Sequence, residues 1–145
     1  MNRYRYKISL RVRHPSMDPA EITYAVDLIP WRCWPAQEPR TTPLGKPLGG
    51  IWPHTYWTAR VMEGEWPGKD LQVAIGEVVD WLELSRSFFE KVHSEGGTAE
   101  FFVGWFFEGQ SGGVFDCGLL ARMAGLKINL SLDLYPPDTP VSLPI

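Results

Sequence analysis

Residues 4–13 read Tyr-Arg-Tyr-Lys-Ile-Ser-Leu-Arg-Val-Arg, and this stretch decides the fold class. Apolar or aromatic side chains take every even position, while basic side chains and one serine take the odd positions. Successive side chains of a β-strand point to opposite faces of its sheet. The period of two therefore predicts a strand with one face in the core and the other in solvent.

Three further segments have strand patterns, at residues 55–62, 98–107 and 127–135. Residues 98–107 are apolar on both faces, which is typical of an internal strand. Residues 127–135 alternate between leucine or isoleucine and polar side chains, so this strand is one-sided like the first. Together they predict a two-layer α+β fold: a single four-stranded sheet, mainly antiparallel or mixed, with helices on one face.

Helical patterns lie between these strands. Asp18, Pro19 and Glu21 provide an N-cap, a proline at the first helical position and an acid in the first turn. Residues 70–95 carry a longer apolar stripe, interrupted at Ser85, so one helix or two remain open there. A short helix is expected before Gly125. The first helix should pack on the sheet through one stripe as far as Pro30, formed by Ile22, Ala25, Val26 and Ile29.

Residues 30–57 contain six prolines, three glycines and four tryptophans. So many prolines predict an excursion without regular helices or strands. The tryptophans should anchor it to the rest of the chain, because a buried indole removes a large apolar area from water. We expect one domain over residues 1–145, with this ordered excursion and an irregular proline-rich tail over residues 136–145 that is mobile at its end.

Composition excludes several classes of protein. No apolar run approaches the roughly 18 residues of a membrane span, and the N-terminus lacks the apolar core of a signal peptide. Cys33 and Cys117 lie far apart, which argues against a disulfide framework. These features predict a soluble cytoplasmic protein with reduced thiols and no membrane contact.

Basic residues are concentrated at the N-terminus of an acidic chain with a net charge of −3. A basic stripe can bind nucleic acid. Because the remainder of the chain is acidic, we interpret the stripe as a solvated sheet face and expect no nucleic-acid binding at physiological salt. The stripe comprises Arg3, Arg5, Lys7, Arg11 and Arg13.

No motif indicates a reaction. Residues 109–113 match the G-x-S-x-G pattern of serine hydrolases, but no helix pattern starts directly after Ser111 and no histidine follows it, so we interpret the segment as a flexible turn. The metal motif H-E-x-x-H and the phosphate-binding loop are both absent. We therefore expect no catalytic residue, metal or cofactor.

One segment does suggest a binding site, around Arg40. Its guanidinium offers a planar fork of donors, threonine hydroxyls add donors and acceptors, and aromatic rings supply apolar walls. Such a set can bind a small anion or a partner protein. Alternatively, the arginine and threonines satisfy the backbone of the proline-rich loop. The candidate residues are Trp34, Arg40, Thr41, Thr42, His54, Tyr56 and Trp57.

Several short motifs, in this order along the chain, resemble the domain-of-unknown-function 4279 family of small bacterial proteins. They are Asp18-Pro19-x-Glu21-Ile22, Trp34, Pro39-Arg40-Thr41-Thr42-Pro43-Leu44-Gly45-x-Pro47-Leu48-Gly49-Gly50, Tyr56-Trp57, Val103-Gly104 and Leu134-Tyr135. The resemblance implies an intracellular bacterial α+β domain and brings no established activity with it.

The sequence thus favours a non-enzymatic binding or protein-interaction module, of an immunity or regulatory type, whose partner is another bacterial protein. The alternative is a protein or enzyme that binds a small anionic ligand in a pocket around Arg40. The oligomeric state is left open by the sequence.

Overall fold

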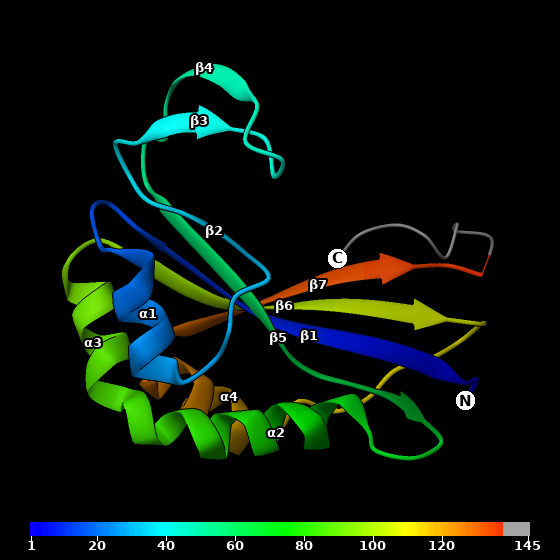
Figure 1. Ribbon diagram of the computed structural model, residues 1–145. Coiled ribbons are helices and arrows are strands. Elements are labelled where there is room, and N and C mark those ends of the chain that lie inside the picture. The colour runs from blue at the N-terminus through cyan, green and yellow to red at the C-terminus, as the bar shows by residue number, and fades with distance from the viewer. Residues whose placement is uncertain (138–145) are drawn as a thin grey trace.

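The first strand of the chain lies in the middle of the sheet. The computed structural model describes residues 1–137, and its main sheet has the strand order β2-β5-β1-β6-β7 (Figure 1). The elements are β1 (Tyr4–His14), α1 (Pro19–Val26), β2 (Arg32–Trp34), β3 (Pro39–Thr41), β4 (Pro47–Ile51), β5 (Thr55–Trp66), α2 (Leu71–Leu82), the 3-10 turn η1 (Glu83–Ser85), α3 (Arg86–Ser94), β6 (Thr98–Phe107), α4 (Cys117–Gly125) and β7 (Ile128–Tyr135).

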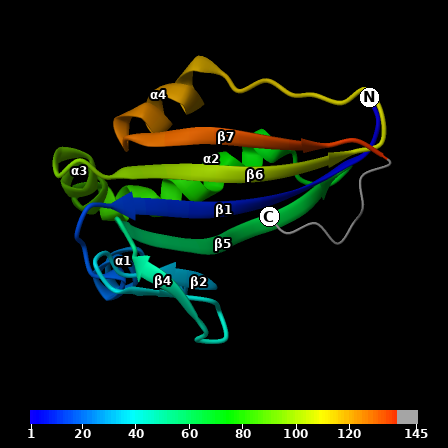
Figure 2. The same cartoon turned by 90° about the horizontal axis from the view of Figure 1, so that it is seen from above.

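The sheet is mixed. β1 pairs antiparallel with both β5 and β6, whereas β6 and β7 are parallel and are joined by the crossover through α4. The helices lie on one face of the sheet, and the other face carries none of them (Figures 1 and 2). The predicted α+β class, the one-sided helical layer and the internal position of residues 98–107 are confirmed. The predicted number of strands is wrong, because β2 adds a fifth strand beyond β5.

The core lies between the sheet and the helices. The even-numbered apolar side chains of β1 are at most 2% exposed and pack in one cluster with α2 and α3. Burying one such side chain stabilises the fold by about 1.5–3 kcal/mol before entropy is counted. The alternation along residues 4–13 thus sets which face of the sheet the helices cover.

α1 begins where its sequence indicates and ends earlier than expected. The Asp18 carboxylate accepts a hydrogen bond from the Ala20 amide at 2.9 Å, and Pro19 is the first helical residue. The helix ends at Val26 because Asp27 adopts a left-handed conformation with φ 55°. The prediction that Ile29 continues the buried stripe is therefore wrong, and its side chain is 89% exposed.

Residues 70–95 form two helices, α2 and α3, joined by η1. Ser85 stands before α3 but makes no side-chain cap there. Its hydroxyl instead donates to the Ala25 carbonyl at 2.8 Å and ties this junction to the end of α1.

Residues 30–57 contain regular structure after all. β2 adds to the main sheet, while β3 and β4 form a separate two-stranded hairpin. Figure 1 shows this hairpin on the side of the sheet opposite to the helices. Pro39 and Pro47 are the first residues of β3 and β4, a position that proline tolerates in a strand. The prediction of an excursion without strands is wrong for this reason.

β5 is longer than predicted and runs through residue 64 to Trp66. Its register with β1 shifts between Ile8 and Ser9, where Ile8 pairs with Met62 and Ser9 with Arg60. This bulge leaves one extra residue in β5, between Arg60 and Met62. Beyond it, odd-numbered residues of β5 lie on the face that even-numbered residues occupy before it. β7 begins at Ile128, after Lys127 at φ 59°. The expectation for the tail falls mostly on residues 138–145, outside the described part of the chain.

Candidate functional site

The face of the sheet without helices is formed by the odd-numbered residues of β1 and the residues paired with them (Figure 2). Directly opposed residues of neighbouring strands share a face, so the register defines the set. We call this surface the open face. Its charged and aromatic members are Arg5, Lys7, Arg11 and Arg13 of β1, Arg32 and Trp34 of β2, Tyr56, Arg60, Glu63 and Glu65 of β5, Glu100, Phe102 and Phe106 of β6, and Asp133 and Tyr135 of β7.

Cations of β1 lie over aromatic rings of β6. The Arg11 guanidinium is 3.6 Å from the centre of the Phe102 ring, and the Arg5 guanidinium is 5.2 Å from that of Phe106. Phe106 stacks in turn on Tyr135, with ring centres 4.6 Å apart and planes 11° apart. Exposed cation–π pairs each contribute about 0.5–1 kcal/mol. The basic side chains of this strand are therefore held against rings.

Two acids fix parts of this arrangement. Glu100 lies 3.4 Å from the Arg13 guanidinium and 3.8 Å from that of Arg11, so one carboxylate holds two bases. The Tyr135 hydroxyl donates a hydrogen bond to Asp133, and this bond, with burial second, raises the pKa of Tyr135. Both contacts order side chains before any partner binds.

Three aromatic rings stack at the β2 end of the open face. Trp34 lies between Trp52, with ring centres 4.0 Å apart, and Tyr56, with ring centres 4.5 Å apart. Strand pairing sets Trp34 opposite Tyr56, and two backbone bonds hold Trp52: the Gln37 amide donates to its carbonyl and its own amide donates to Glu38. We call Trp34, Trp52 and Tyr56 the aromatic stack.

Arginines surround this stack. The Arg40 guanidinium lies 5.5 Å from the Trp52 ring centre, Arg32 lies 5.1 Å from that of Trp34, and Arg13 lies 5.2 Å from that of Tyr56. Arg13 belongs to β1, so the stack continues into the cations of that strand. Among the described residues, Arg40 forms no hydrogen bond or ion pair, and its side chain is exposed. Its guanidinium therefore does not satisfy the backbone of the surrounding loop.

A cavity of about 290 Å³ separates β2 from the β3–β4 hairpin. Thr41 and Thr42 line it as predicted, but Arg40 does not, and the basic side chain on its wall is Arg32. The Thr42 hydroxyl also accepts a hydrogen bond from the Lys46 amide at 3.0 Å, within the hairpin turn. The structure thus divides the predicted site between a cavity and an exposed arginine outside it.

The remaining predicted site residues lie differently. Tyr56 belongs to the aromatic stack, and His54 is half-buried before β5. Trp57 is fully buried in the core, where its indole donates to the Thr23 hydroxyl at 3.0 Å, so it does not line the site. Trp52 was missed by the sequence analysis. Adjacent strand residues point to opposite faces, and this rule alone separates Tyr56 from Trp57.

Cys33 lines the same cavity. Burial, and to a smaller extent the charge of Asp18, raises the pKa of its thiol. A raised pKa lowers the fraction of thiolate, the form that nucleophilic attack needs. This environment disfavours a catalytic role for Cys33.

Several polar atoms under the open face are buried without a hydrogen-bond partner within residues 1–137. They are Ser9 Oγ and Arg11 Nε of β1, Thr58 Oγ1 of β5 and Trp34 Nε1 of β2. Arg11 pairs directly with Thr58, and Ser9 is two residues away, so three of these atoms are close neighbours in the sheet. Buried polar groups normally have partners, and an unpaired one costs free energy.

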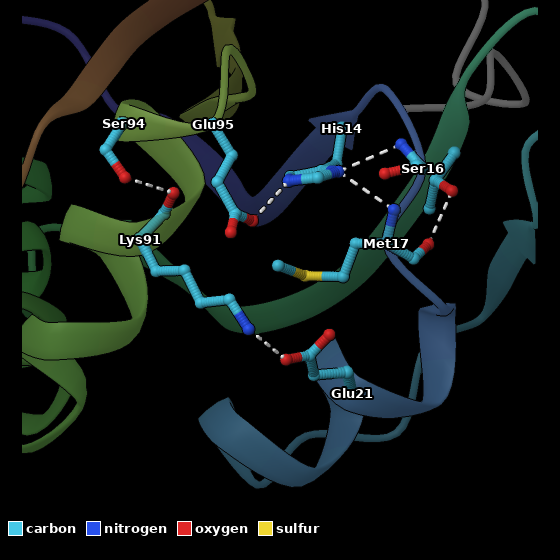
Figure 3. Close-up of polar contacts among 8 residues, drawn as sticks. His14, Ser16, Met17, Glu21, Lys91, Ser94 and Glu95 are labelled. Atoms are coloured by element: carbon cyan, nitrogen blue, oxygen red, sulfur yellow. Dashed lines mark hydrogen bonds and ion pairs between the residues drawn. The ribbon is translucent and has the colours of Figure 1, made fainter.

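A second polar cluster, around His14, joins β1 to α1 and α3 (Figure 3). The His14 ring is buried, and its Nδ1 accepts hydrogen bonds from the amides of Ser16 at 3.0 Å and Met17 at 2.8 Å. Its Nε2 therefore carries the proton and donates to Glu95 at 2.9 Å. A histidine–carboxylate pair resembles part of a catalytic triad, but the lone pair that a general base would use is already engaged. The cluster holds the loop before α1 in place.

No group of three or more His, Cys, Asp or Glu side chains within residues 1–137 is arranged to hold a metal ion. None of the helices in that part of the chain has the length and apolar composition needed to cross a membrane.

The fold and site define an α+β protein with a mixed five-stranded sheet and an uncovered arginine–aromatic face. The chain matches the family described as Domain of unknown function (DUF4279) over residues 4–137, and it belongs to that family. The resemblance found in the sequence motifs is thereby confirmed. No curated protein and no solved structure matches the chain.

Proposed function

We propose that this protein is a non-enzymatic binding module of the bacterial cytoplasm, of an immunity or regulatory type, that recognises another protein through its open face. The observation that carries the proposal is the row of guanidinium–aromatic pairs from Arg40, through the aromatic stack, to Phe106. This row lies on a sheet face over which no helix passes (Figure 2).

The chemistry of this row is that of protein interfaces. Tryptophan, tyrosine and arginine are the residue types most enriched among those that dominate binding energy. Here they occur together at the aromatic stack, where Trp34, Tyr56 and Arg32 come from two paired strands. A rigid sheet presents them in one fixed geometry.

The arginine side chains of the open face are partly ordered in the free protein, and this also supports the proposed role. Immobilising a flexible side chain at an interface costs about 0.5–1.5 kcal/mol. Arg11 and Arg13 are already held by Glu100 and by aromatic rings, so part of this cost is met in the free protein. The arginines thus retain donors for a partner without being fully mobile.

The excess of basic residues favours a partner with an acidic surface. Seven basic residues lie on the open face and on strand β3, against four acidic ones, although the whole chain has a net charge of −3. Such complementarity mainly accelerates association and excludes wrong partners. The bases are Arg5, Lys7, Arg11, Arg13, Arg32, Arg40 and Arg60; the acids are Glu63, Glu65, Glu100 and Asp133.

Unpartnered polar atoms support the same surface. Ser9 Oγ, Arg11 Nε and Thr58 Oγ1 have no partner among residues 1–137. These atoms are buried, so a bound protein supplies the missing hydrogen bonds only where the side chains above them move aside.

A protein suits this face better than nucleic acid. Proteins that bind single-stranded nucleic acid stack its nucleobases on free aromatic rings. Here the rings of Phe102, Phe106 and Trp52 already lie beneath cations. The four acids would also repel phosphates. We therefore expect no gel shift with single-stranded DNA or RNA at physiological salt.

A small anion in the cavity between β2 and the hairpin is the second candidate function. Arg32 and two threonine hydroxyls line that cavity and can bind a carboxylate or phosphate. Phosphate or citrate should then raise the melting temperature of the wild type but not of Arg32→Ala. The exposed position of Arg40 outside the cavity favours protein recognition over this alternative.

The direct test compares capture from the native host by immobilised wild type, Arg40→Ala and Arg13→Ala. Arg122→Ala on α4 is the matched control, because it removes the same side chain from the helical side of the molecule. We expect one protein to bind wild type and Arg122→Ala and to be lost with the two open-face variants. Titration calorimetry with the purified partner then measures the loss.

Stability measurements separate recognition from folding. Arg40→Ala should leave the melting temperature nearly unchanged, because Arg40 forms no hydrogen bond or ion pair with the described residues. Equal capture by all four proteins, or a fall in stability that accounts for the lost binding, would contradict the proposal.

A further inference from the structure

The two edges of the main sheet differ in how well they are protected. β2 forms one edge and has only three residues, Arg32–Trp34, with Pro30 and Pro35 on either side. Short length, a charged side chain and flanking prolines are devices that prevent an edge strand from pairing with another chain. β2 itself is therefore a poor template for pairing, and beyond its three pairs the edge continues as residues 59–66 of β5.

β7 forms the other edge and is much longer, although Pro136 and Pro137 follow it directly. It runs for eight residues, Ile128–Tyr135, without proline, lysine or arginine, and its one charged residue is Asp133. On the helical side of the strand, Leu132 is 42% exposed and Leu134 is 56% exposed. A long, largely apolar edge strand without an internal proline or basic residue is a surface for pairing with a further strand.

We propose that β7 pairs with β7 of a second copy of this chain, antiparallel, about a two-fold axis through Ser131. The dimer would then contain one continuous ten-stranded sheet, made from the five strands of each chain. In such an isologous dimer the same β7 edge is buried on both copies, so neither copy has a β7 edge exposed.

The register about Ser131 is self-complementary. It sets Leu130 opposite Leu132 of the second copy and Ile128 opposite Leu134, so apolar side chains meet on the helical side. On the other side it sets Asn129 opposite Asp133, which gives the carboxylate an amide partner and keeps the two aspartates apart. A register about Asp133 would instead place the two carboxylates together.

The shape of the edge fits the same arrangement. A hollow of about 610 Å³ lies beside the start of β7 and is lined by Leu120 and Met123 of α4 and by Leu130. The exposed leucine at the other end of the strand, Leu134, projects from the sheet. The hollow extends inward to Thr98 of β6, and a two-fold axis brings Leu134 of one strand to the end of the other strand beside it.

The dimer has a consequence for recognition. An axis through a residue of an antiparallel pair is perpendicular to the sheet, so the open faces of both copies would point the same way. Two identical surfaces on one plane bind a repeated or dimeric partner with increased avidity. Failure of this proposal leaves the open face of the single chain unaffected.

The first test measures molar mass by light scattering over a range of protein concentrations. We expect a dimer for the wild type, and Leu132→Lys should weaken it at least about tenfold, since each copy contributes one altered pair. Leu48→Lys is the matched control, because Leu48 is similarly exposed, at 48%, but lies on β4. A wild type that stays monomeric up to about 1 mM would overturn the proposal and leave this edge to a strand of a different protein.

The second test fixes the register by cross-linking. In a chain with Cys33→Ser and Cys117→Ser, Ser131→Cys should oxidise to a covalent dimer, because the two Cα atoms would lie about 5 Å apart. Asn129→Cys should not, because the two copies of residue 129 would be about 13 Å apart. Equal cross-linking of both variants, or none with Ser131→Cys, would contradict the register and with it the proposal.

Discussion

The two faces of β1 show how one strand carries two different tasks. Its even-numbered side chains, such as Leu10, are fully buried against the helices, whereas its odd-numbered side chains, such as Arg11, lie on a face without helices. The backbone and the pairing strands are the same for both. Only the surroundings of the side chains differ.

This difference separates stability from the proposed recognition. Burial of the even face supplies the free energy that holds sheet and helices together. Exposed ion pairs and cation–π contacts on the odd face contribute much less, so residues there can change without unfolding the chain. The open face is thus free to be shaped by a partner.

The strongest test of this comparison is Leu10→Ala. Leu10 is fully buried between β5 and β6, and its truncation removes transfer free energy and leaves a cavity. We expect the free energy of unfolding to fall by about 2–5 kcal/mol in urea denaturation. A loss below that of Arg11→Ala, the neighbouring residue on the open face, would break the comparison.

His14→Ala should have the next largest effect. It leaves the amides of Ser16 and Met17 without the acceptor Nδ1, and the Met17 amide is buried. The expected cost is about 2–3 kcal/mol. His14→Asn should cost less, because its side-chain oxygen can take the place of Nδ1, whereas His14→Gln should resemble His14→Ala. Thermal melts of the three variants check this order.

Gly64→Ala probes the core face beyond the bulge. Gly64 pairs with Tyr6, and an added Cβ would lie 2.7 Å from the ring carbon that bears the Tyr6 hydroxyl. That hydroxyl donates to the Lys69 carbonyl, so the ring cannot move freely. We expect a loss of about 1–3 kcal/mol in urea denaturation. Gly112→Ala is the control, because its Cβ would meet nothing within 4 Å. An equal loss of stability in Gly112→Ala would show that a clash with Tyr6 does not explain the effect of Gly64→Ala.

Arg11→Ala should have the smallest effect on folding. It removes one cation–π contact with Phe102 and one long ion pair with Glu100, together worth about 1 kcal/mol or less. Differential scanning calorimetry at low and high salt checks the value. A loss as large as that of Leu10→Ala would show that the open face carries stability after all.

Much of this fold could be predicted from sequence, since long strands and capped helices leave local patterns. The alternation of residues 4–13, the apolar run of residues 98–107 and the Asp18–Pro19 helix start are all local signals. The strands β2 and β3 have three residues each, too short to show a period. Their existence depends on pairing with distant residues.

The candidate site was predicted in part for the same reason. Arg40, Trp34 and Tyr56 do lie in one region, but the ring that connects them is Trp52, brought in by the fold of the hairpin. The continuity between this region and the cations of β1 also depends on strand order. No local pattern shows that β1 lies beside β5.

The central position of β1 has a consequence for how the chain is made. This strand leaves the ribosome first, yet its partners β5 and β6 begin at Thr55 and Thr98. Contacts between such distant residues give a high contact order, and folding of such topologies takes milliseconds to seconds. Until residues 98–107 are synthesised, β1 has at least one unpaired edge, so the nascent chain is most open to misassociation before β6 appears.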